Sequence, residues 1–282
     1  MKLNKSTPLL NDVILKYIDY HFSENELSPR TKENYYFYYY NVLEYLIKIK
    51  RPILIADEVS IDFLVEFKAW MRQTRTLTTS SRAIELIKKS IKHARITGEV
   101  MNTKVDGFRT PRSKVKDIIA VTEDEINIMS KGIQDEFEQS AFDLYCIQTE
   151  TGQSYGDIWN FKLEERSTGT WLFNSRCKTG KHFGVPITKK VREILKKYNY
   201  NLPRLSNKDY NKYLQNLASR TINKHLTTHT ARKTFATRMY ETGWSLESIA
   251  DMMGITVQVL NTHYILKSLR RVENEYKIRI SA

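Results

Sequence analysis

Apolar residues recur at helical spacing through most of the first hundred residues, and this pattern predicts a helical domain. Ser28 followed by Pro29 is a typical helix start, with an N-cap residue before a proline at the first helical position. The aromatic run after Thr31 indicates packing between helices, and one of its edges is left for stacking against sugars or phosphates. A further helix is predicted from Ser60, with these residues in its apolar positions: Ile61, Leu64, Val65 and Phe67.

The segment 79–96 combines an apolar face with an excess of positive charge. The apolar residues at helical spacing, which we expect to face the core, are Ile84, Ile87, Ile91 and Ala94. The positions around them carry Arg82, Lys88, Lys89, Lys92, His93 and Arg95. A charged helix face is usually only solvated. Because Glu85 is almost the only acid in this segment, contact with phosphates is the better interpretation.

A basic and irregular stretch divides the chain into two domains. Gly98 is expected to end the preceding helix, and residues 107–116 show no periodic apolar pattern. The cations of this stretch, which could follow a nucleic-acid backbone, are Arg109, Arg112, Lys114 and Lys116. Thr122 and Glu125 have the spacing of a capping box and open the next helix. The predicted parts are a helical domain over 1–106, a basic linker over 107–121 and a second domain over 122–282.

The second domain mixes helical and strand patterns. Residues 138–149 predict a buried helix, and residues 171–178 and 181–187, on either side of Thr179 and Gly180, predict a β-hairpin. Helices are also predicted over 220–241 and 245–253. The apolar face of the last one consists of Leu246, Ile249, Ala250 and Met253. The predicted fold class is mainly α with a small β-sheet in the second domain, and its two domains suit a clamp that closes around a duplex.

Composition narrows the range of partners. The chain has 282 residues, 41% of them hydrophobic, which is typical of a folded protein. Its net charge of +13 favours a polyanionic partner. An anionic membrane surface is the competing interpretation, but no apolar run approaches the roughly 20 residues that cross a bilayer. No signal peptide is recognisable, so we expect a cytoplasmic protein, in a bacterium one of the nucleoid.

The two cysteines do not suggest a disulfide framework or a metal site. Cys146 and Cys177 stand far apart, and neither forms a metal-type pair. Each is expected to be a small buried or half-buried hydrophobe. No metal is therefore expected.

Three residues in the last quarter of the chain carry the candidate chemistry. His229 and Arg232 lie three residues apart, and Tyr264 follows in the sequence Asn-Thr-His-Tyr. Together they offer a hydroxyl nucleophile and cationic groups able to hold a phosphodiester, which suggests attack on a DNA backbone. The alternative is that His229 and Arg232 cap a helix, and that Tyr264 is one of seventeen tyrosines.

With the residues around them, these three resemble the tyrosine recombinase (phage integrase) family over residues 7–270. The resemblance is strongest in the stretch from His229 to Arg232, in the hairpin that carries Lys178 and continues to Val185, and in Gly254 followed by Tyr264. The first half of the chain is similar to the helical, SAM-like core-binding domain of that family.

The resemblance implies a site-specific recombinase or integrase of a mobile element. Tyr264 would attack the scissile phosphate and form a 3′-phosphotyrosyl bond, which needs no cofactor. Arg232 would hold the non-bridging oxygens, and His229 would bind the phosphate or manage the tyrosine proton. Lys178 would protonate the leaving 5′-oxygen. The structural alternatives are a solvated turn lysine for Lys178 and a helix-cap residue for His229.

Two positions depart from the family pattern. The family has arginine where this chain has Ser154, and histidine where it has Ile255. Removing one such donor typically costs about a hundred- to a thousand-fold in rate. Because side chains alternate along a strand, Arg176 and Lys178 are expected to share a face, which makes Arg176 a candidate substitute. Its alternative role is binding a flanking phosphate, and His263 is a weaker candidate for the missing histidine.

The resemblance also implies partners. Double-stranded DNA is the expected substrate, with accessory DNA-bending proteins as further expected partners. The last residues have helical spacing at Ile265, Leu269 and Val272 and would dock on a neighbouring protomer, giving a tetramer on DNA. The alternative is an intramolecular helix. Two other functions stay open: a degenerate DNA-binding relative without chemistry, and an enzyme similar to type IB topoisomerases.

Overall fold

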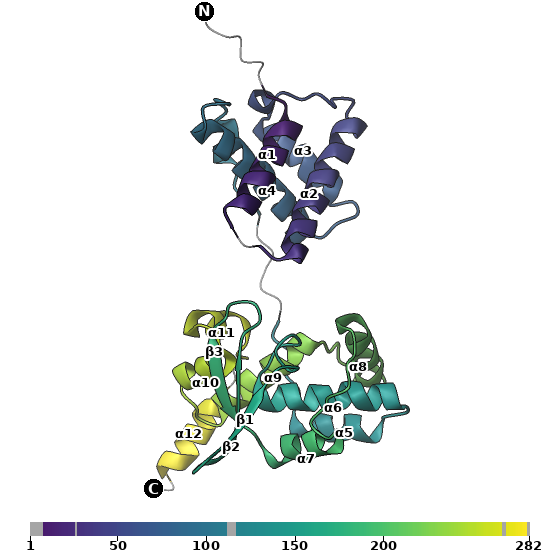
Figure 1. The fold of residues 1–282 in the computed structure, drawn as a ribbon, viewed down its shortest axis with the longest axis vertical. Helices are drawn as coiled ribbons and strands as arrows, with labels where there is room; N and C mark the ends of the chain where they lie inside the picture. Colours follow the sequence, from purple (N-terminus) through teal and green to yellow (C-terminus); the bar gives the residue numbers. More distant parts are fainter. Residues whose placement is uncertain (1–7, 26, 112–116, 267–268, 281–282) are drawn as a thin grey trace, which may run out of the picture. The chain divides into compact units, whose positions relative to one another are not determined.

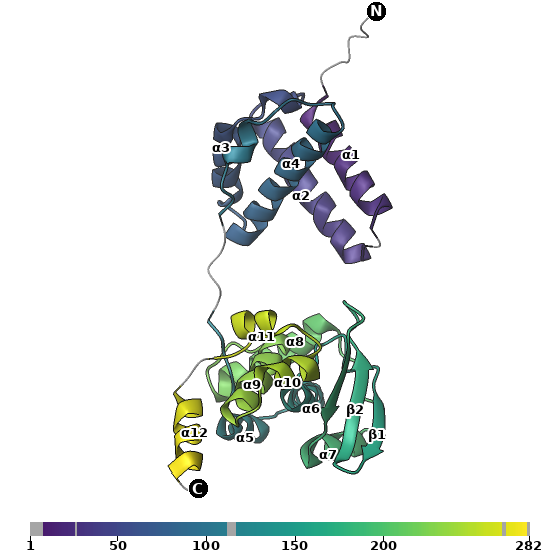
Figure 2. The same cartoon turned by 90° about the vertical axis from the view of Figure 1, so that its left-hand side faces the viewer.

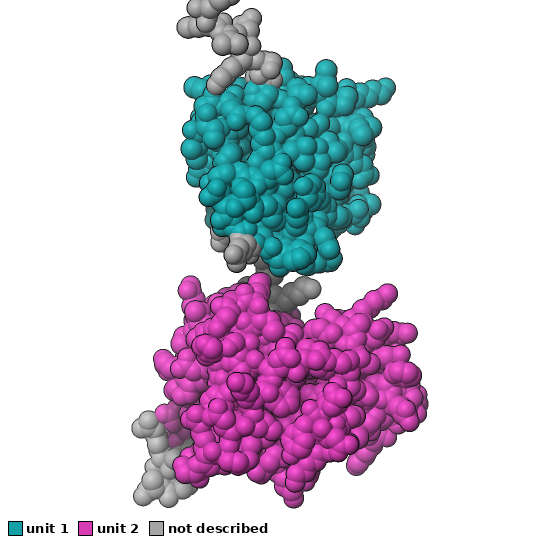
Figure 3. Space-filling model, in the orientation of Figure 1, with its two compact units in different colours: residues 1–114 teal, residues 115–282 magenta. Residues whose placement is uncertain are grey.

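The computed structural model describes residues 8–25, 27–111, 117–266 and 269–280. It divides into two compact units, Met1–Lys114 and Val115–Ala282, each with its own hydrophobic core (Figure 3). In the part of the chain that the structure describes, no helix has both the length and the apolar character to cross a membrane.

The first unit is a helical bundle. Its helices are α1 (Leu10–Ser23), α2 (Pro29–Lys48), α3 (Ile61–Met71) and α4 (Leu77–Ile96) (Figures 1 and 2). A 3₁₀ turn, η1 (Ala56–Glu58), lies between α2 and α3, and a second one, η2 (Lys104–Gly107), follows α4. Helix α4 packs against all three other helices. Its buried face includes Ile84, Ile87, Ile91 and Ala94, which confirms the prediction from helical spacing.

The helix starts in this unit follow from capping side chains. Ser28 accepts a hydrogen bond from the Thr31 backbone N–H, and Ser60 accepts one from that of Phe63. Helix α3 confirms the helix predicted from Ser60. Of its four apolar residues named from the sequence, Leu64 and Phe67 are buried, whereas Ile61 and Val65 are 41% and 44% exposed. The core takes Phe63 and Met71 instead, because these lie on the same helix face as Leu64 and Phe67.

The aromatic run of α2 contributes to packing, as predicted, although some rings stay exposed. The Tyr45 ring contacts the rings of Phe63, Phe67 and Trp70 at centroid distances of 5.3–5.5 Å. Tyr40 is 61% exposed on the same helix. The packing interpretation therefore holds for one face of the run, and the other face is free for a partner.

The beginning of the predicted linker is packed against the first unit. Phe108 is buried, and its carbonyl oxygen accepts a hydrogen bond from Lys88 at 2.5 Å. The Pro111 carbonyl accepts one from Ser81 at 2.6 Å. Arg112, Lys114 and Lys116 lie outside the described residues.

The second unit surrounds one buried helix. Its elements are α5 (Glu123–Lys131), α6 (Glu136–Thr151), β1 (Lys162–Arg166), β2 (Gly169–Ser175), β3 (His182–Pro186), α7 (Lys189–Lys197), α8 (Asn207–Thr221), α9 (Thr228–Glu241), α10 (Leu246–Met253), α11 (Val257–His263) and α12 (Arg270–Ile280). Helix α6 is buried along most of its length and packs against α7, α8 and α9. The antiparallel sheet, in the order β1-β2-β3, lies beside α10 (Figures 1 and 2).

The predicted fold class, mainly α with a small sheet in the second domain, is confirmed, as are the capping box of Thr122 and Glu125 and the hairpin of β2 and β3. Strand β1 was not predicted from the sequence. The single helix predicted over 220–241 is wrong, because α8 ends at Thr221 and α9 starts at Thr228. Between them Asn223 adopts a left-handed conformation with φ 51°, which interrupts the helix.

Candidate active site

The first two turns of α9 carry His229 and Arg232. Thr227 caps this helix, and its N–H donates to the Thr230 hydroxyl at 3.0 Å. The Arg232 side chain is only 1% exposed. Its guanidinium donates to the carbonyl oxygen of Gly152, just after α6, and to that of Met253, the last residue of α10, at 3.2 Å. Carbonyls at helix C-termini are unpaired and partly negative, so they offset the cost of burying this cation.

Tyr264 closes α11 and lies against both α9 residues. Its ring centre is 5.3 Å from the Arg232 guanidinium carbon and 5.1 Å from the His229 ring, which it meets edge to face. The Tyr264 N–H donates to the Leu260 carbonyl at 3.0 Å, and the Thr237 hydroxyl donates to the Tyr264 carbonyl at 3.4 Å. The structure therefore brings together the three residues that the sequence singles out.

Arg176 reaches the same place from the turn between β2 and β3. The turn is closed by the Arg176 N–H, which donates to the Lys181 carbonyl at 2.9 Å. The Arg176 side chain passes over Gly254, where an added Cβ would lie 2.7 Å from the arginine Cγ. Arg232 bonds the carbonyl of Met253, the residue before Gly254, so both arginines converge on this part of the backbone.

A buried carboxylate holds Arg176. Asp157 is 1% exposed, and its Oδ2 lies 2.8 Å from Arg176 Nη1 in an ion pair. Ser154, one of the two positions expected to depart from the family pattern, donates its hydroxyl to the same Oδ2 at 2.6 Å. Asp157 is a site residue that the sequence does not mark, apart from its spacing of three residues from Ser154.

Both arginines have hydrogen-bond donors that are not used by the fold. Within the described residues, three of their buried nitrogens have no hydrogen-bond partner: Arg176 Nε, Arg176 Nη1 and Arg232 Nε. The contact of Nη1 with Asp157 is thus an ion pair without hydrogen-bond alignment. Burial, and then the nearby charge of Arg176, lower the pKa of Arg232 to about 10. Two adjacent guanidinium groups with unused donors suit an anion that has several oxygens.

His229 is neutral at physiological pH. Burial of the ring against its neighbours, followed by the charges of Lys233, Arg232, His263 and Arg176, lowers its pKa to about 4, although the residue keeps an exposed edge. A neutral imidazole can accept a hydrogen bond or a proton. His263, the weaker candidate for the missing histidine, is exposed at the end of α11.

Lys178 lies in the β2–β3 turn and is exposed. The prediction that Arg176 and Lys178 share a strand face is wrong, because β2 ends at Ser175 and both residues belong to the connection beyond it. Cys146 is buried as predicted, but Cys177, in the same turn, is exposed and its thiol donates to the Gly156 carbonyl at 3.1 Å.

At the second departure from the family pattern, Ile255 packs partly buried against the core. Its carbonyl oxygen accepts a hydrogen bond from Lys181 Nζ at 2.9 Å, and this ammonium also lies 3.4 Å from Asp251. The β2–β3 turn is thereby fastened to the loop between α10 and α11. Among the described residues, no group of three or more His, Cys, Asp or Glu side chains is arranged to hold a metal ion.

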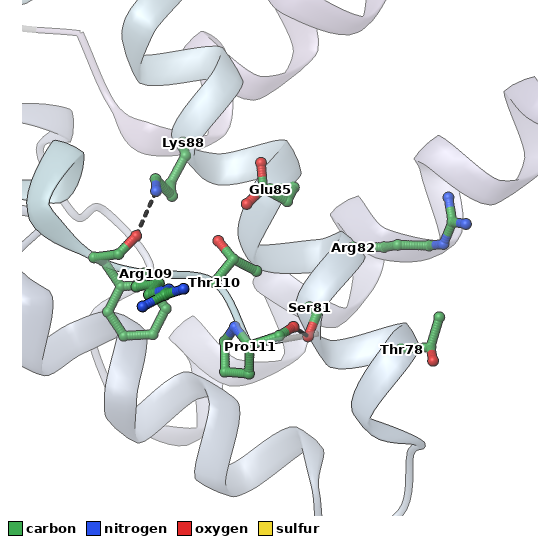
Figure 4. A pocket seen from close by; sticks show the side chains of 9 residues that line it. Thr78, Ser81, Arg82, Glu85, Lys88, Arg109, Thr110 and Pro111 are labelled. Atoms are coloured by element: carbon green, nitrogen blue, oxygen red, sulfur yellow. Dashed lines mark hydrogen bonds between the residues drawn. The ribbon is translucent and has the colours of Figure 1, made fainter. Parts of the chain in front are cut away.

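In the first unit, basic side chains border a groove of about 920 Å³ between α4 and residues 108–111 (Figure 4). Arg82 and Arg109 are exposed, and Glu85 and Thr110 also line the groove. The fold already uses Lys88, through its bond to Phe108. Arg95 makes two contacts within the unit where Lys88 makes one: it pairs with Asp106 at 2.8 Å and donates to the Asn102 carbonyl at 2.8 Å. Lys89 and Lys92 are exposed. Arg112 and Lys114 fall outside the described residues.

Two family models match consecutive parts of the chain. Residues 13–107 match the phage integrase SAM-like domain, and residues 109–265 match the phage integrase family. No curated protein sequence matches significantly.

Solved structures share the fold at low sequence identity. The Tn1549 transposon integrase in complex with a circular intermediate DNA is 14% identical, with a TM-score of 0.72 over 95% of this chain and 99% of that one. A lambda integrase from a tetramer bound to a Holliday junction is 17% identical, with a TM-score of 0.71 over 91% of this chain and 80% of that one. On the strength of the family models, this chain belongs to the phage integrase family and is a tyrosine recombinase.

Proposed function

We propose that this recombinase cleaves and rejoins DNA at specific sites through a covalent bond to Tyr264. The observation that carries the proposal is the Arg232 guanidinium beside the Tyr264 ring, with Arg176 converging on the same stretch of backbone at Met253 and Gly254. Among the described residues, the Nε atoms of both arginines have no hydrogen-bond partner. A phosphodiester offers two non-bridging oxygens and a negative charge, which match these donors. These side chains are thus complementary in charge to the group that Tyr264 would attack.

In the proposed reaction the Tyr264 oxygen forms a bond to phosphorus and the bond from phosphorus to the 5′-oxygen breaks. Arg232 and Arg176 hold the non-bridging oxygens, where charge develops in the transition state. The neutral His229 accepts the tyrosine proton or a hydrogen bond from it. Lys178 donates a proton to the leaving 5′-oxygen, and its exposed position in the turn leaves its ammonium accessible to DNA. Reversal of these steps reseals a strand without an external energy source.

Arg176 takes the place of the arginine that Ser154 lacks. Its guanidinium comes from the β2–β3 turn, and its closeness to Arg232 is supported by their contacts with neighbouring residues, Gly254 and Met253. The second candidate function, DNA binding without chemistry, is favoured by Ile255, which has no polar group to offer a phosphate. Retention of Tyr264 between His229 and Arg232 favours chemistry over that alternative.

We further propose that the helical domain over 1–106 and the linker over 107–121 bind the DNA backbone, while the domain over 122–282 carries the chemistry. The exposed cations Arg82, Lys89, Lys92 and Arg109 are best placed for phosphates. Arg112 and Lys114 belong to the proposed linker. Lys88 and Arg95 add charge, but their donors already serve the fold. A DNA partner implies action in the nucleoid of a bacterial cell.

The last helix supports assembly on DNA. Ile265 is buried in its own unit, whereas an apolar row on and before α12 is 62–74% exposed, namely Leu269, Val272, Tyr276 and Ile280. The contacts of α12 with α9 are polar or cationic, such as Asn274 donating to the Glu241 carbonyl at 3.1 Å. We infer that the apolar row docks on a neighbouring protomer, in a tetramer on DNA. Lambda integrase, a relative in fold, has been seen as a dimer on a core site and as a tetramer on a Holliday junction.

The test of the proposed function is a suicide substrate, a duplex with the recombination site and a nick that releases the cleaved end. The wild-type protein is expected to form a covalent adduct that denaturing gels resolve, and peptide mapping should locate the DNA on Tyr264. Tyr264→Phe should bind the same duplex and form no adduct. Tight binding by the wild type without any adduct would support the non-catalytic alternative instead.

A further inference from the structure

One buried carboxylate connects the two unusual positions of the site. The Asp157 side chain receives the Ser154 hydroxyl on Oδ2 at 2.6 Å and the Cys177 N–H on Oδ1 at 2.9 Å. Its Oδ2 also lies 2.8 Å from Arg176 Nη1. The Asp157 carbonyl accepts a further bond from Asn174 at 2.7 Å. The loop at Asp157 is therefore fastened to the β2–β3 turn by both backbone and side chain.

These contacts keep Asp157 ionised. Burial alone would raise the pKa of its carboxyl, but the bonds from Ser154 and Cys177 and the charge of Arg176 outweigh burial and lower the pKa. A buried carboxylate with satisfied lone pairs is a fixed negative charge. It can hold a cation in one place without being protonated itself.

Arg176 needs such an anchor. Its guanidinium lies close enough to Arg232 and His229 to lower the pKa of both, so the positive charges repel one another. A flexible arginine at the end of a strand would otherwise turn toward solvent. Asp157 and the close contact with Gly254 keep Arg176 at 13% side-chain exposure. In the described structure Nε and Nη1 are buried and have no hydrogen-bond partner, so the ion pair does not use up the donors of this guanidinium.

We propose that Asp157 is a positioning residue that holds the Arg176 guanidinium in the Tyr264 site, and that Ser154 fixes the Asp157 carboxylate for this task. The Ser154 side chain is short, so its hydroxyl donates to Oδ2 and still leaves room for the arginine of the turn to approach the same oxygen. The inference rests on the proposed function, because it gives Asp157 a role in strand cleavage.

A double-mutant cycle on the full chain tests this role. The single-turnover cleavage rate of the suicide substrate is measured at saturating protein for the wild type, Asp157→Asn, Arg176→Ala and the double variant. A guanidinium displaced by about 1 Å can cost on the order of 100-fold in rate, and Asp157→Asn is expected to lose about that much. The double variant should cleave no more slowly than Arg176→Ala, since there is then no guanidinium left to position.

Rescue separates positioning from general stability. Added guanidinium ion is expected to raise the rate of Arg176→Ala several-fold while Asp157 is intact, and to leave the double variant unchanged. Ser154→Ala keeps the ion pair and should lower the wild-type rate by roughly tenfold, without slowing Arg176→Ala further. This variant carries the test if Asp157→Asn melts below the assay temperature.

Asp143→Asn is the matched control. Asp143 is another buried aspartate of this unit. It pairs with Lys197 at 2.6 Å and accepts a hydrogen bond from the Tyr198 hydroxyl at 2.8 Å, and these two partners are not among the residues of the Tyr264 site. Any reduction of the cleavage rate by Asp143→Asn is expected to be the same in the wild type and in Arg176→Ala, so that the two fold-reductions multiply in the double variant. Multiplying rate losses for Asp157→Asn and Arg176→Ala, or equal rescue with and without Asp157, would overturn the inference and leave the proposed function standing. Absence of any wild-type adduct would remove both.

Discussion

The guanidinium carbon of Arg232 lies 5.3 Å from the centre of the Tyr264 ring, at the base of a site to which α9, α11 and the β2–β3 turn all contribute. The arginine is fixed from behind by the carbonyls of Gly152 and Met253. This arrangement orients a buried cation before any substrate arrives. Its Nε has no hydrogen-bond partner among the described residues.

Replacing Arg232 should therefore affect both chemistry and stability. Arg232→Ala is expected to lower the single-turnover cleavage rate by about 100- to 1,000-fold, because one transition-state donor is lost. Arg232→Lys should not restore the rate, since lysine lacks the planar fork of donors. Leaving two buried carbonyls unpaired should lower the free energy of unfolding by about 1–3 kcal/mol each, measured by urea denaturation. A lysine variant with wild-type cleavage would contradict the proposed role of the Arg232 guanidinium in holding the phosphate oxygens.

The pH dependence of stability should carry a signature of His229. Its pKa in the folded protein is about 4, below the ordinary value near 6.5, so the unfolded chain binds more protons between these values. Stability should therefore fall as the pH drops from about 6.5 toward 4, and His229→Gln should lose this part of the dependence. Melting temperatures of both proteins across this range are the measurement. Identical pH profiles would show that the imidazole pKa is not lowered in the folded state.

Gly254 is expected to be irreplaceable for two reasons. Its φ is +62°, and an added Cβ would lie 2.7 Å from Arg176 Cγ. Gly254→Ala should destabilise the protein by about 1 kcal/mol or more through backbone strain and should also slow cleavage by displacing Arg176. Gly98→Ala is the control, because Gly98 has φ +72° with no atom within 4 Å of the added Cβ. The control should lose stability alone, and equal cleavage rates for both variants would argue against displacement of Arg176.

The charges of the first unit should differ in their effect on DNA affinity. Neutralising Lys89 or Lys92, both exposed, should weaken binding uniformly across sequences and reduce the slope of log K against log salt by about 1 for each phosphate contact. Arg95→Ala should mainly lower stability, because Arg95 is paired with Asp106 and bonded to Asn102. Salt titrations of duplex binding by these variants provide the comparison. If Arg95→Ala reduced the slope of log K against log salt by about 1, and the Lys89 and Lys92 variants did not change it, Arg95 and not the two lysines would be the phosphate contact.

The sequence predicts those parts of the fold in which apolar residues recur at a regular spacing. The core face of α4 follows from Ile84, Ile87 and Ile91 at helical spacing. Strand β1 has no such signal, because four of its five residues, Lys-Leu-Glu-Glu-Arg, are charged and exposed. The break at Asn223 depends on one backbone conformation that the side-chain pattern does not reveal.

The sequence predicts the site residues that belong to a motif. It does not predict those that reach the site through tertiary contacts. His229, Arg232 and Tyr264 lie together as their resemblance to the family implies. Arg176 reaches them by the turn and Gly254 rather than by the strand alternation used to predict it. Asp157 could not be assigned its partner, because the ion pair joins a loop after α6 to a hairpin 19 positions later, and no local pattern encodes that contact.

The central claim is that the Tyr264 site is completed by Arg176, and the cleavage rate of Arg176→Ala tests it most directly. At saturating protein and suicide substrate, this variant is expected to form the Tyr264 adduct about 100- to 1,000-fold more slowly than the wild type. Arg192→Ala, an exposed arginine on α7, should cleave at the wild-type rate. Wild-type cleavage by Arg176→Ala, with binding and melting temperature unchanged, would contradict the claim.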